Sequence, residues 1–268
     1  MPSKPLIFAV KRGSLDDGEG IRTVFFLKGC PLRCSWCHNP ESWDGCANIT
    51  LAPDKCLGCG RCGAACSTGA FAGEGPPRID AGRCRRCGAC ADACISGALQ
   101  RVGAFYSHEA LCDIVREDRA FHAASGGGVT FSGGEPLAHM EYVGKAAARL
   151  HAEGVPVCVQ TCGEFAYAAF RRHVARFIDV VYFDVKLMDP EEHARHTGRS
   201  NRRILDNLER LAGDGASIVP RTPLIPGITD TKANLEGIAA FLERLGLAAS
   251  HVLLPCNMTR KRAVVTLI

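Results

Sequence analysis

The sequence predicts an α/β fold in which a parallel sheet is covered by helices and interrupted by a small cysteine-rich insert. Six short runs of β-branched and aromatic residues alternate with stretches of helical periodicity, which is the order expected of a parallel sheet. Residues 56–94 instead consist of closely spaced Cys, Gly and Ala with almost no apolar periodicity. A chain of 268 residues can bury a substantial core outside this insert. The alternation is compatible with either a barrel or a doubly wound sheet.

Each strand is expected from a short run rich in β-branched and aromatic residues. The six runs cover residues 21–28, 128–131, 155–160, 180–187, 217–224 and 251–254. Between them, apolar residues recur at three- and four-residue spacing, which predicts helices over residues 140–151, 166–174, 204–211 and 234–245. A further helix is expected after Ser107, a suitable N-cap for the apolar residues Ala110, Leu111, Ile114 and Val115.

In such folds the chemistry lies at the carboxyl ends of the strands. The polar and cysteine-containing motifs of this chain fall within or after the predicted strands in that way: Cys30, residues 132–136, residues 161–163, Arg221 and Asn257. We therefore expect these side chains to share one active face.

Cysteine is the unusual feature of the composition, because twelve of the 16 cysteines fall between Cys30 and Cys94. Only a short apolar run precedes Lys11 and Arg12, so no secretory signal is expected, and no stretch reaches the ~18–20 apolar residues of a membrane span. The sequence thus predicts a cytoplasmic protein without membrane contact, whose reduced thiols bind metal or do chemistry. The formal charge of +4 is too small, and the arginines are too scattered, to indicate nucleic acid.

The first cysteine motif is GCPLRCSWCHNP, which places Cys30, Cys34 and Cys37 in C-x3-C-x2-C spacing. Three thiolates on one tight loop can bind three corners of a cubane iron–sulfur cluster and leave the fourth iron open to a substrate. A zinc site formed by the same cysteines with His38 is the alternative. It requires His38, which adjoins Cys37, to fold back sharply on the same metal.

The insert contains a second cysteine motif twice, because CLGCGRCGAACSTGAF and CRRCGACADACISGAL align at an offset of 28 residues. Both copies have the C-x2-C-x2-C-x3-C spacing of bacterial two-cluster ferredoxins, in which the fourth cysteine crosses over to the other cluster. Ser67 and Ile95 stand where proline commonly follows that cysteine. One cluster is therefore expected on Cys56, Cys59, Cys62 and Cys94, and the other on Cys84, Cys87, Cys90 and Cys66. A pair of zinc ribbons is the alternative.

The third motif is SGGGVTFSGGEPL at residues 125–137. Glycines after a strand allow close backbone approach to a ligand, and Glu135 is an anionic acceptor suited to an ammonium group. By itself the motif is equally compatible with a glycine turn that carries a solvent-facing glutamate.

Together these segments resemble the radical S-adenosylmethionine (SAM) enzymes, and within them the activating enzymes of glycyl radical enzymes. The similar segments follow the family's order and cover nearly the whole chain: LDDGEGIRTVFFLKGCPLRCSWCHNPES, the eight-cysteine insert, SGGGVTFSGGEPL, VVYFDVKLMDPEEHARHTG and RTPLIPGITD. The resemblance implies an α/β fold of partial (β/α)6 radical SAM barrel type over residues 1–49 and 102–268. It also implies an inserted bacterial-ferredoxin-like domain with two [4Fe-4S] clusters over residues 50–101.

The resemblance also implies roles for residues of the SAM site. Gly133, Gly134 and Glu135 would hold the methionyl amino group, and Asp184 and Lys186 would contact the methionine part. The remaining pocket residues would be His38, Asn39, Arg221 and Asn257, the last at a position where many members have histidine.

Two further segments are compared with the family. Asp17, Gly18 and Gly20 match positions that lie near the incoming glycine peptide, whereas Glu19 replaces the usual proline. Gln160 stands where some members have an acid that helps to bind a monovalent cation, so the resemblance predicts no cation site here.

The implied reaction starts at the cluster on Cys30, Cys34 and Cys37, which reduces bound SAM to methionine and a 5′-deoxyadenosyl radical. This radical removes hydrogen from a glycine Cα of a partner glycyl radical enzyme. The implied cofactors are three [4Fe-4S] clusters and SAM, and the implied electron donor to the monomer is flavodoxin or ferredoxin. A radical SAM enzyme acting on another peptide or small molecule, and an iron–sulfur electron-transfer protein, are the alternatives.

The end of the chain departs from the family pattern. After the last predicted strand the sequence runs MTRKRAVVTLI and stops, without the segment that follows in other members. We expect either a truncated chain or a natural short variant.

Overall fold

The computed structural model describes residues 4–72, 77–255 and 265–266, which form two compact units. The first unit contains the described residues of 1–45 and 105–258, and the second contains those of 46–104 and 259–268. The second unit therefore includes the whole doubled cysteine motif. Among the helices of the described residues, none is long and apolar enough to cross a membrane.

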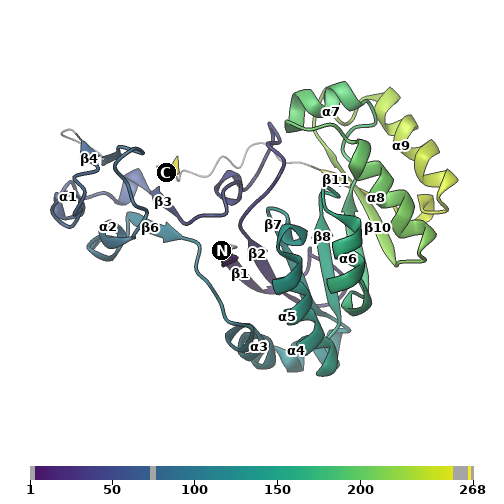
Figure 1. The fold of residues 1–268 in the computed structure, drawn as a ribbon, viewed down its shortest axis with the longest axis horizontal. Helices are drawn as coiled ribbons and strands as arrows, with labels where there is room; N and C mark the ends of the chain where they lie inside the picture. Colours follow the sequence, from purple (N-terminus) through teal and green to yellow (C-terminus); the bar gives the residue numbers. More distant parts are fainter. Residues whose placement is uncertain (1–3, 73–76, 256–264, 267–268) are drawn as a thin grey trace. The chain divides into compact units, whose positions relative to one another are not determined.

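The first unit is built on a seven-stranded sheet with the order β1-β2-β7-β8-β9-β10-β11 (Figure 1). Its strands are β1 (Ile7–Ser14), β2 (Arg22–Leu27), β7 (Gly128–Gly133), β8 (Val157–Thr161), β9 (Val180–Asp184), β10 (Ile218–Leu224) and β11 (Val252–Pro255). Neighbours from β2 to β11 are parallel, and β1 pairs antiparallel with β2. Each parallel strand lies beside the preceding one of the sheet, so the winding never reverses. This is the winding of a (β/α) barrel rather than of a doubly wound sheet.

The two faces of this sheet differ in polarity, because side chains alternate along each strand. One face packs against the helices through a continuous apolar set that includes Phe25, Leu27, Val129, Phe131, Val157, Val159, Val181, Phe183 and Ile218. The residues between them are mostly polar, and they include Arg22, Thr130, Ser132, Gln160, Tyr182, Asp184 and Arg221. The core therefore lies between sheet and helices, and the other face, called here the inner face, is available for chemistry.

Seven helices of the described residues belong to this unit, and several lie along the sheet in Figure 1. They are α3 (His108–Glu117), α4 (Arg119–Ser125), α5 (Met140–Ala152), α6 (Tyr167–His173), α7 (Pro190–Thr197), α8 (Arg202–Gly213) and α9 (Lys232–Arg244). The expected cap of α3 is confirmed, since the Ser107 hydroxyl accepts a hydrogen bond from the amide of Ala110 at 3.1 Å. All six predicted strands and the five predicted helices are present.

Among the strands and α-helices described in the first unit, β1, α4 and α7 were not predicted. Helix α7 has a clear signal that periodicity alone overlooks, because Asp189 accepts hydrogen bonds from the amides of Glu191 and Glu192, and Pro190 occupies the first turn. The helix ends at Gly198, which adopts φ +79°. Strand β1 is an antiparallel edge strand with irregular register, so it lacks the alternation that marks the central strands.

The second unit repeats its structure as well as its sequence. It contains β3 (Asn48–Leu51), α1 (Arg61–Ala64), β4 (Phe71–Ala72), β5 (Arg78–Ile79), α2 (Ala89–Asp92), β6 (Leu99–Val102) and β12 (Val265–Thr266). Helices α1 and α2 occupy equivalent positions, 28 residues apart, and each follows a glycine in the left-handed region. Its apolar core is small and includes Ile49, Leu51 and Leu99, with several of the cysteines packed against it.

Candidate active site

The cysteine loop of the first motif begins directly after β2. Gly29, at φ +95°, turns the chain, and its amide donates to the carbonyl of Ser42 at 2.7 Å. The Lys28 ammonium is fully buried and donates a hydrogen bond to the carbonyl of Glu41, so it links the start of the loop to its end. Short helix η1 (Pro40–Ser42) closes the loop. The strand end and the loop hydrogen bonds thus fix the backbone that carries the cysteines.

Cys30, Cys34 and Cys37 lie close enough to influence one another, and all three are partly buried. Burial raises the pKa of Cys34 to about 11; the Lys186 ammonium lowers it, and the thiolate charges of Cys30 and Cys37 raise it. Burial also raises the pKa of Cys37. Lys186 is the nearby cation that stabilises a thiolate at Cys34, which is the form in which cysteine binds metal.

Glu135 is fully buried, and its carboxylate is held by three groups of the chain. It accepts hydrogen bonds from the amides of Leu137 at 3.0 Å and Cys162 at 2.8 Å, and from the Thr161 hydroxyl at 2.9 Å. Burial raises its pKa despite these donors. The solvent-facing alternative for Glu135 is therefore wrong. The carboxylate joins β7 to β8 at the carboxyl edge of the sheet.

Gly133 and Gly134 are required by the packing of the backbone. A Cβ atom on Gly133 would lie 2.3 Å from the amide nitrogen of Leu27, and one on Gly134 would lie 2.5 Å from the carbonyl oxygen of Gly29. Gly133 also adopts φ +114°. The close approach that these glycines allow in the structure is to the end of β2 and the start of the cysteine loop.

Asp184, Lys186 and Arg221 form a compact ionic group on β9, the loop after it, and β10. The Asp184 carboxylate accepts from Lys186 Nζ at 3.0 Å and from Arg221 Nη2 at 2.8 Å and Nε at 3.1 Å. Burial raises the pKa of Asp184, but the two cations outweigh this effect, so the pKa lies below its ordinary value. The group carries a net positive charge beside Cys34, which suits a carboxylate ligand.

Asp17 is linked to the inner face of the sheet by a hydrogen bond with Gln160. The Gln160 amide donates to Asp17 Oδ1 at 3.1 Å and its carbonyl accepts from the Ser132 hydroxyl at 2.6 Å. Thr130 donates to the Asp17 carbonyl at 2.8 Å. These hydrogen bonds hold the segment 14–20 against the inner face of β7 and β8. A neutral amide is what allows Gln160 to donate to the Asp17 carboxylate.

We expect Gln160→Glu to loosen this segment, because a second carboxylate would face that of Asp17 at about 3 Å. The free energy of unfolding should fall by about 1–2 kcal/mol at pH 8, and amide exchange in residues 14–20 should accelerate several-fold. Hydrogen-exchange mass spectrometry measures both changes. Gln100→Glu, at an exposed position of β6, is the matched control and should leave residues 14–20 unchanged. Equal exchange in both variants would contradict the role of Gln160.

Cys162 belongs to the segment 161–163 expected at the active face, but no role in the site was predicted for it. Its buried thiol donates a hydrogen bond to Cys30, which lowers the pKa of Cys30 and raises that of Cys162 well above its ordinary value. Its amide also binds Glu135. Its spacing to the other cysteines gave no signal, but its position directly after β8, at the carboxyl edge of the sheet, could have identified it.

The remaining predicted SAM-site residues are His38, Asn39 and Asn257. His38 is exposed and Asn39 is partly buried, both at the end of the cysteine loop. The Asn39 carbonyl accepts from the amide of Ser42 at 2.9 Å. Asn257 lies outside the described residues. The structure thus brings together the triad, Glu135 and the Asp184 group, but it does not assign a contact of His38 or Asn39 to a ligand.

In the second unit, Cys56, Cys59, Cys62 and Cys94 line one cavity of about 440 Å³. Cys66 and Cys94, the fourth cysteines of the two copies, each accept a backbone hydrogen bond at 3.3 Å, from Ala70 and Leu99. The Thr68 hydroxyl and the Ala70 amide hold the pKa of Cys66 below its ordinary value. Stabilised thiolates are the form in which cysteine binds metal.

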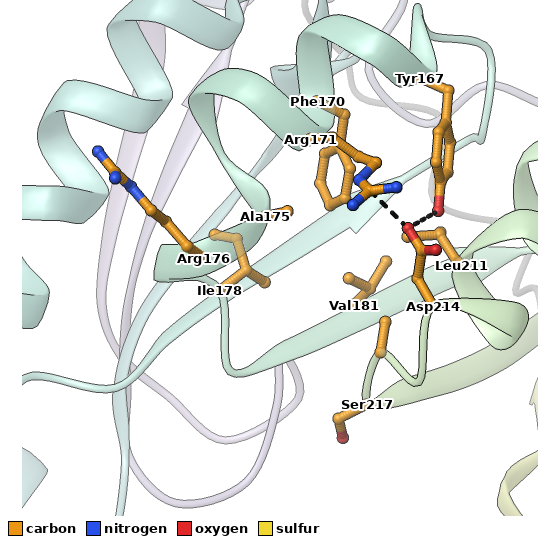
Figure 2. Close-up of a pocket in the computed structure, with 11 residues that line it drawn as sticks. Tyr167, Phe170, Arg171, Ala175, Arg176, Ile178, Val181, Leu211, Asp214 and Ser217 are labelled. Atoms are coloured by element: carbon orange, nitrogen blue, oxygen red, sulfur yellow. Dashed lines mark hydrogen bonds and ion pairs between the residues drawn. The ribbon is translucent and has the colours of Figure 1, made fainter.

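A separate pocket of about 420 Å³ lies at the amino ends of β9 and β10 (Figure 2). Phe170, Val181 and Leu211 form its apolar part, and Asp214 pairs with Arg171 at 3.5 Å and accepts from the Tyr167 hydroxyl at 2.9 Å. In a barrel of this winding the amino ends of the strands serve stability and the carboxyl ends carry the chemistry. We therefore place the active site at the cysteine loop and not in this pocket.

The one-way winding defines an α/β fold of the barrel type, with the cysteine loop, Glu135 and Asp184 at its carboxyl edge. Its sequence matches the Radical SAM superfamily over residues 24–238, and the chain belongs to that superfamily. The resemblance inferred from the cysteine triad is thus confirmed.

The similar proteins include glycyl radical enzyme activating enzymes. The chain is 40% identical over 257 residues to the benzylsuccinate synthase activating enzyme of Thauera aromatica, covering 92% of this chain and 77% of the relative. It is 38% identical over 251 residues to the pyruvate formate-lyase 2-activating enzyme of Escherichia coli, covering 92% and 76%. Among solved structures, SuiB of Streptococcus suis bound to its precursor peptide has a TM-score of 0.50 at 10% identity, over 57% of this chain and 34% of SuiB, which shows a shared fold.

Proposed function

We propose that this protein is the activating enzyme of a glycyl radical enzyme. The observation that carries the proposal is the convergence of Cys30, Cys34 and Cys37 beside Lys186 at the carboxyl edge of the sheet. The relatives named above, which are themselves activating enzymes, support the choice of a glycyl radical enzyme as the partner.

The residues present fit an iron–sulfur cluster with one open iron. Three partly buried thiols share one loop, and Lys186 and the Cys162 thiol lie next to them. Cys30, Cys34 and Cys37 would hold this cluster, which would supply the one electron needed to cleave SAM to methionine and a 5′-deoxyadenosyl radical able to abstract hydrogen from a glycine Cα of the partner.

The chain's own residues would bind and orient SAM. Lys186 and Arg221, held in place by Asp184, present two cations to the methionine carboxylate. Glu135 would hold the methionyl ammonium group, as a carboxylate oriented by the amides of Leu137 and Cys162 and by the Thr161 hydroxyl. Asp17, fastened by Gln160, would lie near the incoming glycine peptide.

The second unit would hold two [4Fe-4S] clusters with crossed ligands. The cavity lined by Cys56, Cys59, Cys62 and Cys94 supports this pairing, because Cys94 belongs to the other copy of the motif. The remaining set would be Cys66, Cys84, Cys87 and Cys90. These clusters would pass electrons from flavodoxin or ferredoxin to a monomeric enzyme in the cytoplasm, where thiols stay reduced.

Anaerobic reconstitution tests the proposal. We expect about eleven to twelve iron atoms per chain, and 5′-deoxyadenosine upon addition of dithionite and SAM. Hydrogen abstraction is measured separately, as a glycyl radical signal in electron paramagnetic resonance with a candidate glycyl radical enzyme. Stoichiometric zinc without SAM cleavage would overturn the iron–sulfur assignment in favour of the zinc alternatives. SAM cleavage with a modified peptide or small molecule, and no radical on any glycyl radical enzyme, would favour the other radical SAM reaction class.

A further inference from the structure

The two copies of the insert motif have the same backbone but different charges. Gly60 and Gly88 are equivalent positions before α1 and α2, at φ +71° and φ +91°. The difference in charge lies in the loops that precede these glycines. In the first copy Leu57 and Gly58 follow the first cysteine, and in the second copy Arg85 and Arg86 occupy the equivalent positions.

Arg86 occupies a position whose backbone conformation favours glycine. It is the one non-glycine residue with positive φ in the described part of the chain, at φ +53°, and its counterpart Gly58 has φ +64°. A side chain in this region strains the backbone. This backbone conformation allows the amide of Arg86 to donate a hydrogen bond to Cys84 Sγ at 3.3 Å. Glycine performs that task without strain in the first copy, so Arg86 distinguishes the second copy by its charge and not by its backbone.

Further positive charge gathers at the same loop, residues 83–87, which we call the basic loop. Arg101 of β6 packs over Gly88, where a Cβ would lie 2.8 Å from Arg101 Cδ, whereas the equivalent space above Gly60 is open. Asp80 is the one acid among residues 80–89, and it is paired with Arg83 at 3.5 Å. Arg85 and Cys87 are exposed. The basic loop therefore presents a positive surface around an exposed cysteine.

We propose that the basic loop, together with Arg101, is the docking surface of an acidic electron-transfer protein. This inference rests on the proposed function, because it assumes that Cys84 and Cys87 hold a cluster. One electron leaves the donor and enters the insert, and no bond or proton changes place. Opposite charges at such a contact accelerate encounter and allow rapid release, as a transient electron-transfer complex requires. Leu57 and Gly58 give the first copy no such charge.

The test converts the basic loop into the sequence of the first copy. R85L/R86G introduces the residues that the first copy has at these positions, and it removes the strained backbone, so we expect it to fold and bind iron as the wild type does. The control is K55A/R61A, which removes two positive charges from the first copy of the same unit. Binding is measured on the reconstituted enzyme by calorimetry, with an acidic flavodoxin as the probe at 50 mM and 300 mM NaCl.

We expect R85L/R86G to weaken flavodoxin binding about tenfold at 50 mM NaCl and to flatten its salt dependence, while K55A/R61A stays within about twofold of the wild type. Stopped-flow reduction of the insert by reduced flavodoxin should slow in parallel, and reduction by dithionite should not. Equal flavodoxin binding by both variants would overturn the inference, with dithionite-driven SAM cleavage still supporting the proposed function. Absence of that cleavage in the wild type would instead overturn the proposed function itself.

Discussion

Cys34→Ala should abolish SAM cleavage and leave the clusters of the insert intact. Cys34 lies at the centre of the triad, where its charge is coupled to those of Cys30, Cys37 and Lys186. Two remaining thiolates cannot hold a cluster with a single open iron, so the reconstituted variant should contain about four iron atoms fewer than the wild type. Dithionite with SAM should yield 5′-deoxyadenosine at background level. Iron analysis and product chromatography measure the two effects.

Cys59→Ala is the matched control for Cys34→Ala, because it removes a cysteine from the insert instead. It should also lose about four iron atoms, but it should retain dithionite-driven SAM cleavage. Cys112→Ala, a buried cysteine of α3 in the apolar core, should keep all iron. Retained cleavage in Cys34→Ala would remove the triad from the mechanism. Lost cleavage in Cys59→Ala would mean that the insert is needed even when the reductant is small.

The cysteines and the sheet could be predicted from the sequence because both have short-range signals. Ligand spacing is a local property, and the alternation of strand-like and helix-like runs located all six parallel strands. The end of the sheet that carries the chemistry could also be predicted, because Cys30 and Asp184 lie at strand ends or shortly after them. Strand order could not be predicted, because a barrel and a doubly wound sheet share the same alternation.

The contacts across the site could not be predicted, because they join residues far apart in the chain. Gln160 meets Asp17 across 143 positions, and Cys162 meets Cys30 across the same edge of the sheet. The glycines of the Gly-Gly-Glu motif also needed the structure. Sequence reasoning assigned Gly133 and Gly134 to a ligand, whereas their lack of a side chain is required by the backbone of Leu27 and Gly29. Glycine at these positions indicated that a side chain would not fit. Only the fold shows which backbone atoms occupy that space.

Asp184→Asn should destabilise the barrel and impair the site. Asp184 is the common partner of Lys186 and Arg221, whose side chains are 7% and 13% exposed. Without the carboxylate, two cations are left together in a poorly solvated place, so the free energy of unfolding should fall by about 2–3 kcal/mol. Arg221 also loses two hydrogen bonds that orient it, and SAM cleavage should fall at least about tenfold. Anaerobic denaturation followed by circular dichroism, and product formation per bound cluster, measure these effects.

The pH dependence gives an independent check on the same group. The pKa of Asp184 is lowered in the folded protein, so its stabilising contribution is complete above the ordinary carboxyl range and is lost as the pH falls through the folded value. The difference in stability between the wild type and Asp184→Asn should therefore be constant from about pH 6 to pH 8 and shrink below about pH 4. Asp206→Asn, which breaks an exposed pair with Arg210 on α8, should cost less than about 0.5 kcal/mol at every pH. A difference for Asp184→Asn no larger than that of Asp206→Asn would show that the ionic group does not stabilise the barrel.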